Sequence, residues 1–242
     1  MSVKNRIIIS FLIITFGLIL WSCSAKEAEK VKSTSLSAEM YYDSFGQGQS
    51  LLTMRLLTTN NDGERSQVQL VEDDSINISV DGQSVNLTQS HKKDENPVSY
   101  QTTINDVGTG KEITISIQQK SGLSAPNSVV TLPPDFAIKE IVFDFNTIDY
   151  QWNPSSPTGI IELIHRLTCT NTVYTHRDTR TDSGSYSLAK SLFLSTYQLD
   201  TLEGCLFSLT LIRTSVGSLD KHFNDEGFIK GRQIREIKDI EI

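Results

Sequence analysis

Apolar and polar residues alternate along most of the chain, beginning at about residue 36. In the segment 75–80, SINISV, the large apolar residues occupy every second position, and the segment 83–88, QSVNLT, repeats this pattern. A period of two is typical of a β-strand with one buried face. Between these segments lies Asp81-Gly82, a dipeptide that suits the tight turn of a two-residue hairpin. The pattern therefore predicts a β-hairpin here.

Further alternating segments follow at 111–120, 159–169 and 204–213, with clusters of turn-forming residues between them. Short strands at this spacing predict an all-β sandwich or barrel. The segment 187–195, SLAKSLFLS, could form a short helix, but we favour a turn followed by a strand. The C-terminal segment 231–242 is charged enough for a helix, yet its isoleucines fit neither the helical nor the strand period.

A boundary is expected at Pro133-Pro134, because consecutive prolines cannot continue a strand ladder. It separates residues 36–133 from residues 137–242. Each part has roughly the 100 residues of one immunoglobulin-sized sandwich. We therefore predict two tandem β-sandwich domains.

The N-terminus has the layout of an export signal. Lys4 and Arg6 precede an uninterrupted stretch of fifteen mostly apolar residues, Ile7–Trp21. A helix needs about 20 apolar residues to span a bilayer, so this stretch is short for a membrane span and suits a signal peptide. A polar segment then follows the stretch.

The residues at this border, Leu20, Trp21, Ser22 and Cys23, resemble the lipobox of bacterial lipoproteins, although Trp21 is bulkier than is usual there. The resemblance implies that residues 1–22 are a cleaved signal peptide and that Cys23 carries the lipid. Several acyl chains on one residue would anchor the protein stably. Ser24 then fits export to the outer membrane, with the protein periplasmic or surface-exposed. The alternative is an uncleaved signal anchor with a chance cysteine.

Residues 23–35 would form a flexible tether.

The net charge of the chain narrows the range of partners. The whole chain has a net charge of −7, and removal of Lys4 and Arg6 with the signal would make it more negative. This argues against nucleic acid, whose binding depends on basic patches. It also argues against a polybasic membrane-binding surface.

Two cysteines remain once Cys23 is acylated, namely Cys169 and Cys205. Disulfides persist in exported proteins, and two cysteines allow a single pairing. We therefore predict a Cys169–Cys205 disulfide, with two buried free thiols as the alternative. The sequence contains no C-x-x-C motif and its histidines are scattered, so we expect no metal and no cofactor.

Two features of residues 137–242 resemble immunoglobulin or fibronectin-type domains. The first is a tryptophan, Trp152, ahead of Cys169. The second is a D-x-G-x-Y segment, formed by Asp182, Gly184 and Tyr186. The similarity ends at Leu188, where an antibody-type domain has its second cysteine; here that cysteine is Cys205. The resemblance implies an immunoglobulin-like sandwich with a disulfide of its own.

Motifs that suggest catalysis are isolated. Ser187–Lys190 matches the S-x-x-K of serine acyltransferases, but the partner motifs S-D-N and K-T-G are missing. The glycines around Lys111 lack the spacing of a phosphate loop, so a hairpin turn is the better interpretation. His165, His176 and Asp178 would need an aligned nucleophile. We therefore expect no enzyme.

Aromatic residues are the more promising binding candidates. One group surrounds Tyr41, and a second contains Phe143, Phe145, Tyr150 and Trp152. Tyr150 and Trp152 could bind a ligand on an exposed platform, although such residues more often fill a core. The acidic turns at 60–64 and 71–75 lack a calcium-loop pattern and are better explained as solvated turns.

Our leading hypothesis is a lipid-anchored protein of the cell envelope that acts as a non-catalytic interaction or assembly module. Its partner would be an envelope protein or a glycan. The second hypothesis is a carbohydrate- or peptide-binding module that uses exposed aromatic residues or an open strand edge. A hydrolase is the third.

Overall fold

The computed structural model describes most of the chain after residue 35. The described residues are 26–27, 36–60, 62–71, 73–85, 99–105, 108–120, 122, 124–170 and 172–242. The signal peptide predicted over 1–22, Cys23 and most of the tether predicted over 23–35 lie outside these residues. Within them, no helix is long and apolar enough to cross a membrane.

The described residues form strands and one short helix, which confirms the all-β class. The strands of the first half are β1 Lys26–Glu27, β2 Leu36–Ser44, β3 Gln49–Thr59, β4 Arg65–Gln69, β5 Ser75–Val80, β6 Gln83–Val85, β7 Tyr100–Asn105, β8 Glu112–Gln118 and β9 Ser124–Thr131. Those of the second half are β10 Ala137–Phe143, β11 Thr147–Asn153, β12 Ser156–Cys169, β13 Thr172–Asp182, β14 Ser185–Ala189, β15 Leu206–Val216 and β16 Phe228–Glu241, with helix α1 at Ser191–Tyr197.

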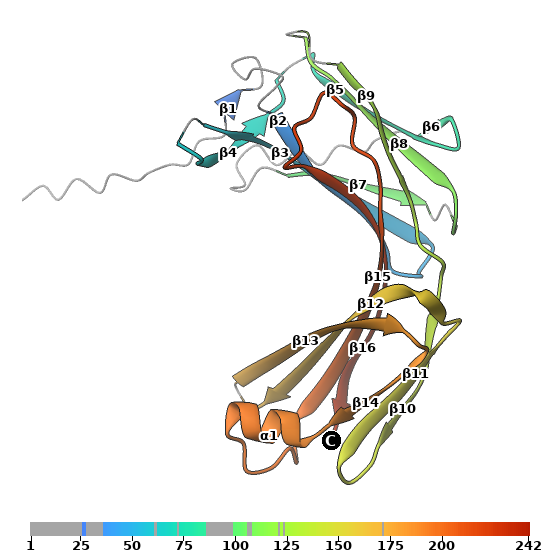
Figure 1. Ribbon diagram of the computed structural model, residues 1–242, viewed down its shortest axis with the longest axis vertical. Coiled ribbons are helices and arrows are strands. Elements are labelled where there is room, and N and C mark those ends of the chain that lie inside the picture. Colours follow the sequence, from blue (N-terminus) through green and yellow to red (C-terminus); the bar gives the residue numbers. More distant parts are fainter. Residues whose placement is uncertain are drawn as a thin grey trace, which may run out of the picture.

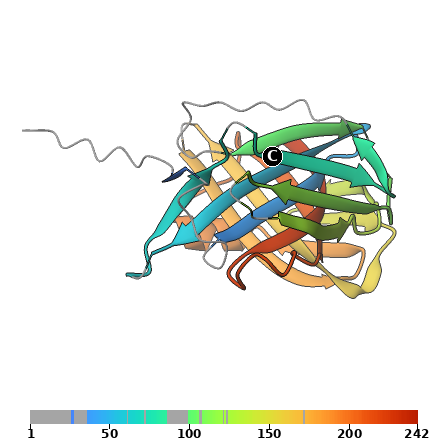
Figure 2. The same cartoon turned by 90° about the horizontal axis from the view of Figure 1, so that it is seen from above.

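These strands form three sheets around two hydrophobic cores. The large sheet has the order β1-β4-β3-β2-β16-β15-β12-β13, with β7 also paired to β3. The first core lies between this sheet and the sheet β6-β5-β8-β9, and the second lies between it and the small sheet β10-β11-β14. Figure 1 shows the two parts at opposite ends of a curved molecule, and Figure 2 shows the blue and green strands of the first part above the orange strands of the second.

The long strands β15 and β16 run from one core to the other (Figure 1). Leu209 and Leu211 of β15 lie in the second core, whereas Ile229 of β16 lies in the first. Strand β16 also pairs in parallel with β2, so one continuous sheet joins the two halves. Glycine at Gly231 permits this arrangement, because a Cβ there would collide with the backbone of β9.

The continuous sheet changes the meaning of the predicted boundary. Most of the first core comes from residues 36–132, as the split between 36–133 and 137–242 requires. However, Leu219, Phe223 and Ile229 pack in that first core, although they lie far beyond Pro134. A boundary at Pro133-Pro134 therefore separates the cores only in part. Independent folding of residues 137–242 stays a prediction.

Two local predictions are confirmed. Strands β5 and β6 form a hairpin around Asp81 and Gly82, which both have positive φ. Cys169 and Cys205 form a disulfide with their Cα atoms 4.3 Å apart. Its loop of 36 residues corresponds to about 3–4 kcal/mol in the chain-entropy treatment. The disulfide joins the last residue of β12 to the residue directly before β15, at the end of two paired strands of one sheet, and so differs from the inter-sheet bridge of antibody domains.

The structure contradicts one further local expectation and explains the irregular pattern of the C-terminal segment. The segment after Ala189 is the helix α1, although we favoured a strand there. The C-terminal segment is strand β16, and a bulge explains its irregular pattern. Ile237 pairs with Leu209 and Ile240 pairs with Phe207, with a register shift between them near Asp239. The extra residue lets two isoleucines three positions apart share one face.

A buried ion pair of the second half holds the linker that follows the first half. Arg213 of β15 donates from Nε to Asp182 of β13 at 2.5 Å, and their side chains are only 3% and 1% exposed. Trp152 donates its indole N–H to the same carboxylate at 2.6 Å. Arg213 also donates to the carbonyl oxygens of Pro134 and Pro154. One guanidinium therefore holds the linker between the cores against β11, β13 and β15.

Substitution of this arginine tests the junction. We expect Arg213→Met to lower the free energy of unfolding by about 3–5 kcal/mol, because Asp182 would be left buried without its counter-charge. The double variant Arg213→Met/Asp182→Asn should recover part of this loss, since the asparagine side chain is neutral and can still accept the Trp152 hydrogen bond. Urea unfolding of both variants measures the difference. Equal destabilisation by the single and double variants would contradict the assigned role.

Candidate functional site

A groove of about 970 Å³ lies along the open edge of the second core, between β13 and β14. Strand β13 contributes Thr179, Arg180 and Thr181, and strand β14 contributes Ser185, Tyr186 and Ser187. Side chains of consecutive strand residues point to opposite faces. A lining that includes three consecutive residues from each strand therefore follows the strand edges. The remaining lining residues are Glu140, Val142, Asp149, Tyr150, Gln151, Trp152, Leu163 and Ser183.

The edge of β13 that faces the groove has outward-pointing backbone groups. Cys169 and Thr172 flank the two-residue turn between β12 and β13, so they form a hydrogen-bonded pair. By alternation, the even-numbered residues of β13 bond to β12, and the odd-numbered ones point their N–H and C=O away from it. The carbonyl of Thr175 confirms this direction, because it accepts a hydrogen bond from Tyr197 of α1 at 2.8 Å. Thr179 has the same outward orientation, and its N–H bonds to the side chain of Asp178, which leaves its carbonyl facing the groove.

The edge of β14 is arranged in the same way. Trp152 donates its backbone N–H to Gly184, and Lys190 donates its own to Asn146, so even-numbered positions bond toward β11. The N–H and C=O of Ser187 therefore point away from β11. In the described part of the chain, β13 ends the large sheet and β14 ends the small one. The groove thus lies between two strand edges that have no further strand beside them there.

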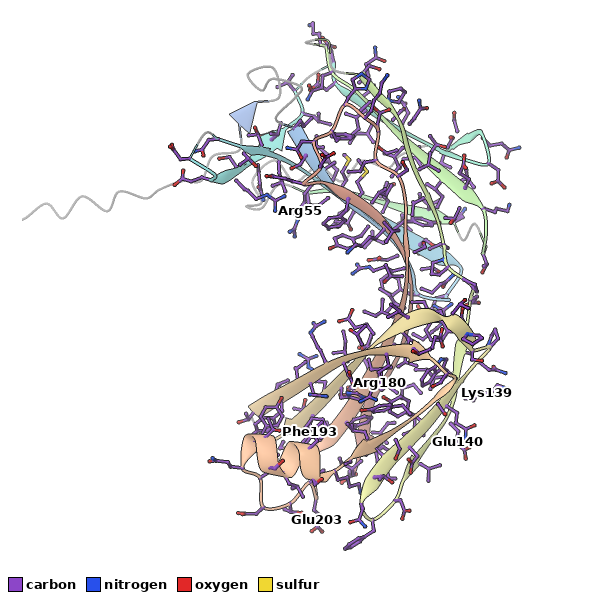
Figure 3. All side chains as sticks on the ribbon, in the orientation of Figure 1. Arg55, Lys139, Glu140, Arg180, Phe193 and Glu203 are labelled. Atoms are coloured by element: carbon purple, nitrogen blue, oxygen red, sulfur yellow. A yellow bond between two sulfur atoms is a disulfide. The ribbon has the colours of Figure 1, made fainter. Side chains whose placement is uncertain are left out.

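A compact charged group stands at the centre of the groove. Arg180 donates from Nε to Asp178 at 2.5 Å, and its guanidinium lies 4.5 Å from the ring centre of Tyr186. Tyr186 also donates to Asp178 at 3.3 Å. Partial burial acts to raise the pKa of Asp178, but the hydrogen bond and charge of Arg180 outweigh it, and the pKa is lowered. Arg180, which is labelled in Figure 3, is half-exposed, and its contacts with Asp178 and Tyr186 hold it in place.

The outer face of the small sheet adds an acidic wall to the groove. Asp149 pairs across the strands with Ser187 on one side and Val142 on the other, and Gln151 similarly lies beside Glu140. Hydrogen bonds from Ser187 and Thr147 lower the pKa of Asp149, so its carboxylate is charged at neutral pH. The groove therefore has a cation on its inner side and carboxylates on its outer side.

Tyr150 and Trp152 lie beneath the groove and do not form an exposed platform. Their side chains are 1% and 3% exposed and belong to the second core. Tyr150 contacts the buried His165, with its hydroxyl 2.6 Å from Nε2. Burial raises the pKa of Tyr150, so the phenol keeps its proton and donates it to this nitrogen. A role of Tyr150 or Trp152 in ligand binding stays a prediction.

The catalytic candidates are brought together only in part: His165, His176 and Asp178 lie close to one another, without a catalytic serine motif beside them. Ser187 lies on strand β14, whereas S-x-x-K chemistry needs its serine on a helix. His165 contacts Tyr150, and its ring stacks on that of His176 at 5.7 Å. Among the described residues, no group of three or more His, Cys, Asp or Glu side chains could hold a metal ion. Gly108 and Gly110 have positive φ and precede β8, as expected of a turn.

The remaining aromatic candidates are separated. Phe143 packs on Phe207 of the second core, whereas Phe145 is exposed at the turn between β10 and β11. Tyr41 packs edge-to-face on Phe228 and lies beneath the guanidinium of Arg232. These rings therefore do not assemble into one surface.

Sequence reasoning missed Arg180 and Asp149 as members of a site. The neighbours of Arg180 in the chain, TRTD, look like an ordinary charged turn. Alternation of charged and threonine residues across 178–182 was the available signal, since charged residues are common on edge strands.

Comparisons with known proteins provide no identification. No family model matches the sequence, and no curated protein is similar to it. Among solved structures, the dimeric latent PorU from Porphyromonas gingivalis aligns with 85% of this chain and 21% of its own, at 7% identity and a TM-score of 0.27. This chain thus spans about a fifth of that protein's length. Similarity at this level carries no argument about fold or function.

The buried histidine generates a pH prediction. Burial, followed by the nearby charge of His176, lowers the pKa of His165 from 6.5 to about 4. The unfolded chain then binds a proton more readily than the folded one, so stability falls as pH drops from about 6.5 towards 4. We expect a loss of about 2 kcal/mol between pH 7 and pH 5 from this residue.

Urea unfolding at both pH values measures this loss. His165→Gln is the matched variant, because glutamine can still accept the Tyr150 hydrogen bond but does not titrate. An unchanged pH dependence in this variant would show that other groups cause the effect.

Proposed function

We propose that the protein is a lipid-anchored, non-catalytic interaction or assembly module of the cell envelope, and that the groove between β13 and β14 is its contact surface. The lipid would be attached at Cys23, the tether 23–35 would separate the domain from the membrane, and the protein would stand on the outer membrane. The partner would be an envelope protein or a glycan.

The observation that supports this proposal is the pair of strand edges along one groove. Backbone N–H and C=O groups at an open edge form hydrogen bonds readily with an incoming chain. Ser187 provides its N–H and C=O on one side, and Thr179 provides its C=O on the other, since its N–H bonds to Asp178. Arg180, held by Asp178 and Tyr186, adds a fixed charge between them. Fixed polar groups of this kind orient a partner at little entropic cost.

A carbohydrate partner is the second candidate. The groove wall carries carboxylate, amide and hydroxyl groups at Asp149, Gln151 and Ser185, which could bond sugar hydroxyls. Tyr150 and Trp152 are too buried to offer a stacking face without rearrangement. The backbone edges therefore favour a protein partner.

Photo-crosslinking in intact envelopes tests the proposal. A photoreactive amino acid at Thr179 or Ser185 should give at least tenfold more adduct than one at Lys120, an exposed residue of the first half that serves as the control. The mass of the adduct separates a protein from a glycan. Cys23→Ala should abolish acylation and leave the protein in the precursor form or only loosely bound to the membrane.

Two results would count against the proposal. Equal adduct from the groove and from Lys120 would remove the groove as the contact surface. Normal membrane fractionation and normal mature size of the Cys23→Ala variant would remove the lipid anchor.

A further inference from the structure

The small sheet β10-β11-β14 is incomplete on one side. It has three strands, and β14 ends it with five residues whose alternate backbone groups face the groove. The lining includes side chains from both faces of β14, namely Tyr186 on the inner face and Ser185 and Ser187 on the outer face. An empty volume that touches both faces of an edge strand lies where the next strand of the sheet would run.

The two faces beside that position differ in charge: the inner face carries the Arg180–Asp178 ion pair, and the outer face carries carboxylates without such a pair among the groove residues. On the inner face, Arg180 lies against Tyr186. On the outer face, Asp149 adjoins Ser187, and Glu140 lies one strand farther on β10. Because side chains of an extended chain alternate between faces, one strand in this position would meet the cation with every second residue and the carboxylates with the others.

Arg180 can bind a further carboxylate without losing its present partner. Its Nε donates to Asp178, and a guanidinium has five N–H donors in a planar fork. Its contact with the Tyr186 ring fixes the plane of the fork. Bidentate pairing of arginine with a carboxylate gives both strength and direction.

We propose that β14 binds an extended peptide segment of a partner protein as a fourth strand of the small sheet. An acidic side chain of the peptide would pair with Arg180, and basic side chains on the opposite face would lie toward Asp149 and Glu140. This inference rests on the proposed function, and it specifies the class of partner. Backbone hydrogen bonds to the Ser187 edge would provide affinity, and the two charged faces would select the sequence.

A designed peptide tests the inference on the full-length protein in detergent. The probe is the fluorescein-labelled heptapeptide VTKEKTV, whose central glutamate and flanking lysines point to opposite faces when it is extended. The control, VTKKETV, has the same residues and net charge, but its glutamate lies on the opposite face from that of the probe. Fluorescence anisotropy should show saturable binding of the probe and at least tenfold weaker binding of the control.

Backbone methylation separates strand addition from other modes. An added strand uses the amides of alternate residues only, so N-methylation of one alternate set should abolish binding, and methylation of the other set should be tolerated. On the protein, Ser187→Pro should weaken binding at least tenfold by removing the outward N–H, which an edge strand tolerates structurally.

A matched pair of protein variants tests the charge contact with Arg180. Arg180→Gln should weaken binding of the probe at least tenfold. Arg177→Gln should leave binding unchanged, because Arg177 is on the same strand but its side chain lies on the other face. Circular dichroism and thermal melting confirm that each variant is folded.

Equal binding of the two peptides, or equal effects of the two methylation sets, would overturn the inference. Absence of binding at millimolar probe would also overturn it, and persistent crosslinking at Thr179 would then leave the proposed function standing.

Discussion

The buried pair between Arg213 and Asp182 determines how the parts of this protein meet. Asp182 ends β13, directly before the turn that leads into β14, and Arg213 lies on the strand that runs through both cores. Replacing such a pair by apolar residues is often neutral, but removing one partner is costly, so the pair specifies an arrangement more than it adds stability. Its additional bonds to Trp152 and Pro134 fix the linker and β11 at the same point.

The groove follows from this arrangement. Because Asp182 is held in the large sheet while β14 joins the small one, β13 and β14 separate after their turn and leave their edges apart. Soluble proteins usually protect such edges. Here α1 covers one end through Tyr197, and the hydroxyl of Ser183 bonds the carbonyl of Ser185 at the other. The middle of the groove keeps the N–H and C=O of Ser187 and the C=O of Thr179 available.

Local features were predictable from the sequence because neighbouring residues determine them. The Asp81-Gly82 hairpin needs positive φ at two adjacent residues, and the disulfide had only one possible pairing. Helix α1 was missed because it has no side-chain N-cap and no acidic residue in its first turn; Phe193 in the second core holds it in place. The parallel pairing of β16 with β2 joins residues almost 190 positions apart, which local patterns do not encode.

The groove could not be predicted for the same reason, since an edge strand is defined by the absence of a spatial neighbour. Amide hydrogen exchange, resolved by residue in the intact protein, tests this central claim most directly. We expect the amide of Ser187 to exchange nearly as fast as in an unfolded chain. Those of Arg180 and Leu188, which bond to the adjacent strands, should be protected at least 100-fold. Protection of Ser187 equal to that of Leu188 would show that the edge of β14 is already occupied and would contradict the account.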